Sequence, residues 1–265
     1  MRLNAIKKRE PFVYVRPSPD PRLAGLVEYW SINSKGKTIS RVMISPDKDL
    51  KVIFDFDRAG GNPVPYLLGI QLKPEVLARK RPVDIISVNF LPGSFYSLFQ
   101  IPADRFIGKK LPLISAIGPR AAGFYEIFTK KTLKARVQCL NSILLDLAKT
   151  KMPAPPTIIC ALKEIYASNG KAKVISVAKT SGLSRFGFTR LFKKWVGADP
   201  RLYSVHLCFT KASRELIDGK SVYEVMDKFG YYDQSHFIRV FKRRMGWTPT
   251  MRFKPKRHVI TAQPR

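Results

Sequence analysis

Two stretches of the chain repeat one pattern of residues, and this repeat strongly restricts what the C-terminal part can fold into. The stretches are "SGLSRFGFTRLFKKWVGADP" (181–200) and "FGYYDQSHFIRVFKRRMGWTP" (229–249). Both contain a glycine, a capping residue, the frame Phe-x-Arg-apolar-Phe-Lys-basic and a final Gly-x-x-Pro. Phe188 in the first copy matches Phe237 about 49 residues later. Self-similarity of this kind indicates two copies of one structural unit.

The spacing of the apolar residues predicts a short amphipathic helix in each copy. Ser184 and Asp233 stand where a side-chain oxygen caps the first amide groups, and Gly197 and Gly246 are stop signals. Another short helix is predicted before each one, in "VISVAKTSG" and "SVYEVMDKFG". Two short helices joined by a glycine turn form a candidate helix-turn-helix, whose second helix faces DNA. For a single copy, a solvated amphipathic helix is an equal alternative.

Charge and cysteine content narrow the class of protein. The 265 residues carry a formal net charge of +29, and residues 157–265 hold 22 Lys and Arg against 7 Asp and Glu. Such a surplus favours a polyanionic partner, either nucleic acid or an anionic membrane surface. The cysteines are sparse and far apart, which suits a reducing compartment. No signal peptide or transmembrane segment is expected, so the sequence predicts a cytoplasmic protein.

No pattern in the chain predicts catalysis, a metal site or a cofactor. The sequence contains no CxxC motif and no Cys/His cluster of the kind that binds zinc. The histidines are too scattered for a metal site or a catalytic triad, and His206 and His258 are expected to be ordinary surface or helix residues. We therefore expect neither an enzyme nor a metalloprotein. The cysteines are Cys139, Cys160 and Cys208, and the remaining histidine is His236.

The first half of the chain reads as β-structure. "LKVIFDF" (50–56) and "VDIISVNFLPG" (83–93) alternate apolar and polar residues, and "TISRVMISP" and "VPYLLGIQL" are further strand candidates. "ARKRP" (78–82) is interpreted as a solvated loop. Regularly spaced short strands predict a small β-barrel or sandwich, cupin-like in class. The inward positions of these strands are mainly apolar, which favours a packed, ligand-free interior. The identity of any small-molecule effector remains unknown. The inward apolar residues are Val52, Phe54, Ile86, Val88 and Phe90.

A helix is predicted between the β-rich part and the repeats. Its apolar residues recur at heptad spacing over about two heptads, which predicts a homodimer seam, with packing on the β-domain as the alternative. The proline-rich stretch "MPAPPT" (152–157) is the best candidate for a linker. The seam residues are Leu133, Val137, Leu140, Leu144 and Leu147.

These patterns predict a multidomain α+β protein. A β-rich regulatory domain spans residues 1–130, and a connecting helix and linker span 131–156. An all-α domain with two helix-turn-helix motifs spans 157–265.

Residues 157–254 closely resemble the AraC/XylS family of bacterial transcription regulators, with the more specific match in the second half. The N-terminal part is similar to the small β-domain found in a subset of that family, on the cues "LVEYWSI", "ISPDKDLKVIFDF", "VNFLPGSFYSLFQIP" and "LPLISAIG". The matching C-terminal residues are Leu183-Ser184-Arg185, Leu191-Phe192-Lys193, Gly197, Pro200, Tyr203, Ala212, Gly230-Tyr231, Asp233-Gln234-Ser235-His236-Phe237, Phe241-Lys242, Gly246 and Thr248-Pro249.

The resemblance implies that both motifs bind double-stranded promoter DNA. By position in the family motif, the base-facing residues are Phe186, Thr189, Arg190, Gln234, Ser235, His236 and Arg239. The residues placed for phosphate groups are Arg185, Lys193, Lys194, Lys242 and Arg243. RNA polymerase is an expected partner of such a regulator.

The chain departs from the family at two positions. Cys208 stands where an arginine is usual, and Gly187 should weaken the first recognition helix by roughly 0.5–1 kcal/mol relative to alanine. A basic architectural DNA-binding protein with little sequence preference is the alternative function. The operator sequence, the direction of regulation and the oligomeric state are not determined by the sequence.

Overall fold

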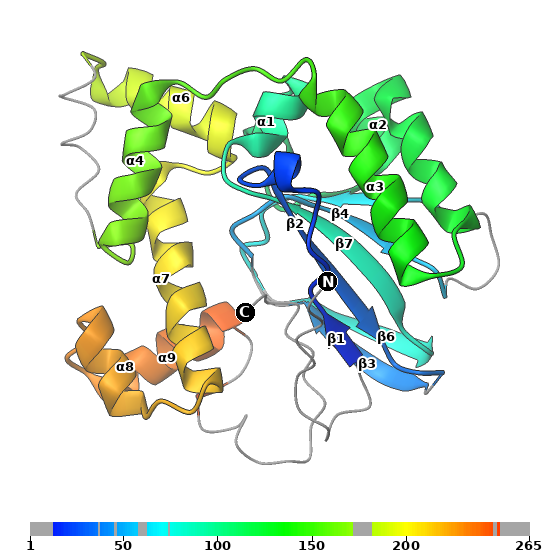
Figure 1. Cartoon of the computed structure of the whole chain (residues 1–265). Coiled ribbons are helices and arrows are strands. Elements are labelled where there is room, and N and C mark those ends of the chain that lie inside the picture. The colour runs from blue at the N-terminus through cyan, green and yellow to red at the C-terminus, as the bar shows by residue number, and fades with distance from the viewer. Residues whose placement is uncertain are drawn as a thin grey trace.

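The structure is a computed structural model that describes residues 13–36, 38–44, 47–57, 63–73, 75–171, 182–245 and 248–249. An antiparallel β-sheet region forms the N-terminal part and helices form the C-terminal part, which confirms the predicted fold class (Figure 1). The helix predicted within "VISVAKTSG" lies outside the described residues.

The strands form a six-stranded antiparallel sheet and a separate two-stranded ladder. In the sheet, β7 lies between β2 and β4, and β1 and β8 are the edges. In spatial order the sheet contains β1 (Val13–Val15), β2 (Val27–Asn33), β7 (Asp84–Phe90), β4 (Lys51–Asp55), β5 (Tyr66–Leu68) and β8 (Lys110–Pro112). The ladder contains β3 (Ile39–Ile44) and β6 (Glu75–Arg81).

The alternation read from the sequence matches the strands β4 and β7. Phe54 and Ile86 are fully buried and are paired in register, so the apolar side of each strand faces the core. The interpretation of 78–82 as a solvated loop is wrong for residues 78–81, which belong to β6. Backbone pairing with β3 forms this strand, and such pairing requires no apolar alternation along the chain.

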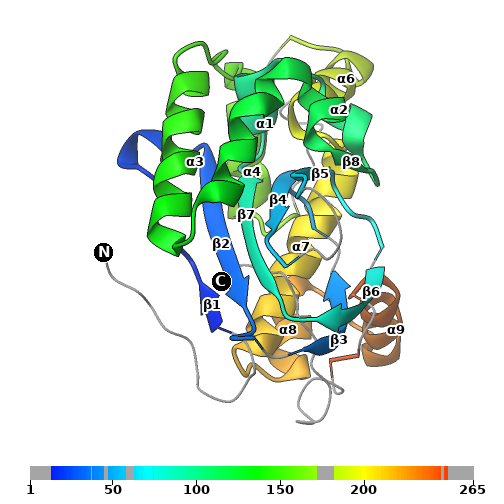
Figure 2. The ribbon, with the colours of Figure 1, turned by 90° about the vertical axis from the view of Figure 1, so that its right-hand side faces the viewer.

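Short helices cover one face of the sheet (Figures 1 and 2). Aromatic rings make the contact. The Phe54 ring of β4 stacks on the Phe124 ring with 6.2 Å between the ring centroids, and the Phe90 ring of β7 packs edge-on against the Phe99 ring with 5.7 Å between the centroids. The covering elements are α1 (Ser94–Phe99), α2 (Leu113–Ile117), α3 (Leu133–Ala148) and the 3-10 segments η1 (Pro21–Leu23), η2 (Ala103–Phe106) and η3 (Gly118–Thr129).

The apolar face of α3 packs inside the protein. Val137, Leu140 and Leu144 are at most 4% exposed and belong to the main hydrophobic core, while Leu133 and Leu147 pack against it. This burial favours the alternative, packing on the β-domain, over a homodimer seam on these residues, because a heptad pattern marks burial without saying what provides it.

Five described helices follow α3 and divide between two hydrophobic cores. The α4 and α6 helices and the first half of α7 share the core of the N-terminal region, whereas the second half of α7 forms a separate core with α8 and α9. None of the helices in the part of the chain that the structure describes is long and apolar enough to cross a membrane. The helices are α4 (Pro156–Ala167), α6 (Arg185–Val196), α7 (Pro200–Ile217), α8 (Val222–Phe229) and α9 (Gln234–Met245).

Candidate nucleic-acid interface

The helix α6 has one buried and one exposed face. Ser184 caps it by accepting a hydrogen bond from the Gly187 amide at 3.1 Å. Phe188 and Phe192 are buried, with ring centroids 5.9 Å apart. The opposite face presents Phe186, which is 87% exposed, together with other predicted DNA-facing residues, Thr189, Arg190 and Lys193.

The helix α9 repeats this arrangement. Its first amides, those of Ser235 and His236, donate to the Asp233 carboxylate at 2.8 and 3.2 Å. Phe237 and Phe241 are fully buried, with ring centroids 5.5 Å apart. Five predicted DNA-facing side chains of this helix are exposed: Ser235, His236, Arg239, Lys242 and Arg243.

Gln234 is the half-buried member of the predicted base-facing set in α9. The hydroxyl of Tyr223 on α8 donates to its Oε1 at 3.3 Å. This bond joins the two helices of the second motif and orients the amide at the start of the recognition helix. Sequence reasoning missed Tyr223, because nothing in the spacing of the two residues shows that α8 brings its ring to the tip of α9.

The two recognition helices present equivalent positions to the solvent. When the two copies are aligned with an offset of 49 residues, Arg190 corresponds to Arg239 and Lys193 corresponds to Lys242. All four side chains are exposed. The same offset places Phe186 on Ser235. A helix face with three equivalent exposed positions in both copies is what two related DNA-reading surfaces require.

Two of the residues predicted for phosphate groups flank the exposed face of α6. The ammonium group of Lys194 lies 5.0 Å from the centre of the Tyr96 ring, which belongs to α1 of the N-terminal region. Arg185 is exposed at the first turn, and its carbonyl accepts a hydrogen bond from the hydroxyl of Thr189 at 2.9 Å. Lys193 lies on the exposed face itself, in line with Phe186 and Arg190.

The first motif is attached to the N-terminal region. Trp195 of α6 is 3% exposed, and its ring lies 4.6 Å from that of Tyr96 on α1. Gly197 ends α6 with a φ of +99°, and a side chain added there would meet Ile70 and Leu50. These two residues flank β5 and β4, so the end of the first recognition helix is built into the surface of the N-terminal region.

A buried cluster of charges lies at the same contact. Lys48 is paired with Asp49, and Lys51 is paired with Asp47. The ammonium of Lys48 also lies 6.0 Å from the centre of the Tyr203 ring on α7. Burial raises the pKa of Asp49 and, together with that carboxylate, raises the pKa of the Tyr203 hydroxyl well above its ordinary value.

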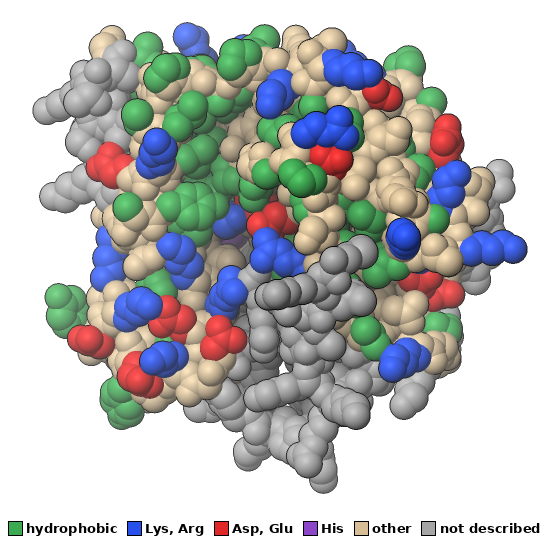
Figure 3. Space-filling model, in the orientation of Figure 1, with side chains coloured by type: hydrophobic (Ala, Val, Ile, Leu, Met, Phe, Trp, Pro, Cys, Tyr) green, Lys and Arg blue, Asp and Glu red, His purple; other side chains and the backbone are tan. Residues whose placement is uncertain are grey.

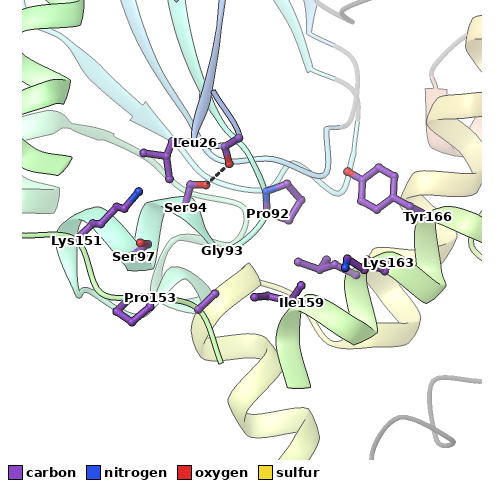
Figure 4. Close-up of a pocket in the computed structure, with 13 residues that line it drawn as sticks. Leu26, Pro92, Gly93, Ser94, Ser97, Lys151, Pro153, Ile159, Lys163 and Tyr166 are labelled. Atoms are coloured by element: carbon purple, nitrogen blue, oxygen red, sulfur yellow. Dashed lines mark hydrogen bonds between the residues drawn. The ribbon is translucent and has the colours of Figure 1, made fainter. Parts of the chain in front are cut away.

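A cleft of about 540 Å³ opens between the N-terminal region, the linker and α4. Figure 4 shows Leu26, Pro92 and Ser94 on one side and Ile159 and Lys163 of α4 on the other. Figure 3 shows hydrophobic side chains gathered where α4 meets the N-terminal region. Apolar groups dominate the cleft, and its lining contains two lysines and no carboxylate.

The linker and the end of α4 are held in place by hydrogen bonds. The Met152 amide donates to the carbonyl of Ser97 at 2.9 Å, and the Ser97 hydroxyl donates back to the Met152 carbonyl at 2.6 Å. Lys211 of α7 donates to the carbonyl of Tyr166 at 3.0 Å, at the C-terminal end of α4. The Lys171 ammonium donates to the carbonyl of Lys228 at 2.8 Å, at the end of α8. These bonds connect α4 to both the N-terminal region and the second motif.

The histidine and the cysteine of α7 lie inside the protein or partly buried. His206, expected to be a surface or helix residue, is a buried residue of α7. Cys208 lies half-buried beside Tyr231, with its sulfur 3.9 Å from the hydroxyl oxygen. Within the described ranges, no group of three or more His, Cys, Asp or Glu residues could hold a metal ion.

Two regions of the chain match protein-family models. Residues 177–254 match a model described as a helix-turn-helix domain, and residues 15–112 match a domain of unknown function, DUF6597. No curated protein sequence matches the chain.

The chain is similar to solved structures of ToxT from Vibrio cholerae. ToxT of strain O395 shares 13% identity, with 84% of this chain and 99% of that chain covered and a TM-score of 0.40. A P21 crystal form of ToxT shares 10% identity, with 91% and 96% covered and a TM-score of 0.43.

The matched helix-turn-helix domain, together with the paired recognition helices, makes this chain a DNA-binding transcription regulator. Its helix-turn-helix domain is of the AraC type, and a DUF6597 domain precedes it on the N-terminal side.

Proposed function

We propose that the chain binds one specific double-stranded promoter site through both recognition helices at once. The observation that carries the proposal is the matched exposed face of α6 and α9, in which the same three positions of each helix are accessible. In this proposal Arg190 and Arg239 contact base edges, since arginine pairs bidentately with guanine. Lys193 and Lys242 contact phosphate groups and set the register of the protein on the duplex.

The helix α7 provides the spacing between the motifs. Its 18 residues correspond to about 27 Å at 1.5 Å per residue, comparable to the roughly 34 Å between successive major grooves on one face of DNA. Asp199 caps its start by accepting a hydrogen bond from the Leu202 amide at 2.9 Å. Both cores include residues of α7, which favours a constant separation of the two recognition helices.

The N-terminal region is proposed to regulate this binding from within the same chain. Trp195 and Gly197 connect the first recognition helix directly to α1 and to the residues that flank β4 and β5. A change in the packing of the N-terminal region would therefore alter the position of α6. We place this activity in the cytoplasm, where a bacterial regulator reaches both the promoter and RNA polymerase.

Selection of bound sequences from random duplex DNA, followed by footprinting, tests the proposal. We expect one enriched sequence with two protected segments, about one helical turn apart. Titrations against that site and random DNA at several salt concentrations should then show a specificity ratio of at least ~10³ at physiological salt. Nearly equal affinity for both DNAs would instead indicate a basic architectural protein and would contradict the proposal.

A further inference from the structure

Phe186 is an aromatic side chain with no packing role in the described structure. It lies in the first turn of α6, is 87% exposed, and belongs to neither of the two large hydrophobic cores. Its neighbours in sequence and on the next turn, Phe188 and Phe192, point to the opposite side and are buried. Contact with a partner on the recognition face would remove this large apolar group from water, which is favourable.

Thr189, the residue next to Phe186 on the same face of α6, adds to the apolar character of that face. Thr189 lies one turn later, and its hydroxyl donates to the Arg185 carbonyl at 2.9 Å. The hydroxyl proton is thus used inside the helix, and the threonine methyl group remains for contact. The equivalent of Phe186 in the second motif is Ser235, so one position of the repeat is apolar in α6 and polar in α9.

We propose that Phe186 contacts the C5 methyl group of a thymine in the major groove. The inference rests on the proposed function, and it names the base that the first motif recognises. Among the groups that base pairs expose in the major groove, the thymine methyl is the apolar one, whereas the others donate or accept hydrogen bonds. A phosphate or a polar base edge would leave the phenyl ring without a matching partner. The first motif therefore recognises an A·T pair by apolar contact, in addition to the base that Arg190 reads through hydrogen bonds.

Replacement of single thymines by deoxyuridine in the selected site tests this contact directly. The exchange removes one methyl group and keeps every hydrogen-bonding atom of the base. For the wild-type protein we expect about fourfold weaker binding at one thymine, the change that corresponds to one methyl group removed from a buried contact. Phe186→Ala should bind the thymine site at least fourfold more weakly and should no longer distinguish thymine from deoxyuridine at that position. Phe186→Leu should retain part of the discrimination.

Two controls separate this contact from a general loss of binding. Ile114→Ala removes a 44% exposed apolar side chain from α2 in the N-terminal region and should keep the wild-type discrimination. Circular dichroism checks that Phe186→Ala is folded, which the exposure of this residue leads us to expect.

The outcomes distinguish this inference from the proposed function. Selection that enriches no sequence would overturn both. A specific site at which no deoxyuridine exchange weakens wild-type binding would overturn only the thymine contact. Discrimination that persists in Phe186→Ala would overturn it as well, because another residue would then contact the methyl group.

Discussion

Gly197→Ala probes the contact between the first recognition helix and the N-terminal region. The added Cβ would lie 3.0 Å from Cδ1 of Ile70, 3.2 Å from Cδ1 of Leu50 and 3.3 Å from the carbonyl oxygen of Ala103. All three atoms belong to the N-terminal region. The backbone φ of +99° adds a second cost, because residues with a Cβ rarely adopt this conformation.

The two costs give the size of the expected effect. A non-glycine residue in the left-handed region costs about 1–2 kcal/mol, and overpacking of a well-filled site costs about 1–3 kcal/mol more. Gly197→Ala should therefore lower the free energy of unfolding by about 2–5 kcal/mol. Gly230→Ala is the matched control, since Gly230 also ends a helix with a positive φ of +73°. Its nearest neighbour at 3.4 Å is the end of the flexible Lys171 side chain, so only the backbone cost of about 1–2 kcal/mol is expected.

Urea unfolding of the full-length variants, followed by circular dichroism, measures the difference. We expect the midpoint of Gly197→Ala to lie clearly below that of Gly230→Ala. Equal losses in the two variants would refute the reasoning, because they would mean that the N-terminal region does not crowd the end of α6.

Three further substitutions test the DNA interface and the core. Arg239→Ala should lower the affinity for the selected site by about 1–3 kcal/mol and relax the preference at one base pair in a competition assay, whereas equal weakening on random DNA would assign this residue to phosphate. Lys193→Ala should weaken specific and random DNA alike and reduce the salt slope by about one unit, and Lys134→Ala on α3 should leave the slope unchanged. Leu140→Glu places a charge in the core and should lower the free energy of unfolding by roughly 4 kcal/mol or more, whereas Gln138→Glu on the exposed side of α3 should have little effect. A folded Leu140→Glu variant whose sedimentation mass is lower than that of the wild type would instead support the homodimer seam.

The recognition helices were predictable because their signals are local. The caps Ser184, Ser221 and Asp233 lie within three residues of the amides that they accept from. The apolar positions of α6 and α9 repeat with the period of a helix, and the same positions are buried in the structure. The strands β4 and β7 were predictable for the same reason, since alternation with a period of two requires only neighbouring residues.

The strand β6 and the face of α3 depend on partners that are distant in sequence. The charged residues of 78–81 form a strand because β3 provides their backbone hydrogen bonds. Leu140 and Leu144 are buried by the chain itself, and their heptad spacing would be the same beside a second subunit. Local periodicity indicates that a face is covered, and only the tertiary structure shows which surface covers it.

The sequence alone determines the two helix-turn-helix units, their capping residues and the identity of the exposed residues on each recognition helix, because helix periodicity and capping act over a few residues. Only the tertiary structure decides that the first motif joins the core of the N-terminal region while the second has a core of its own. Trp195 and Tyr96 are far apart in sequence, and their rings meet at 4.6 Å only when the sheet, α1 and α6 have packed together. The hydrophobic effect depends on the apolar area buried and has no preferred direction. The sequence therefore indicates which apolar surface must be buried, and only the tertiary structure shows which part of the chain buries it.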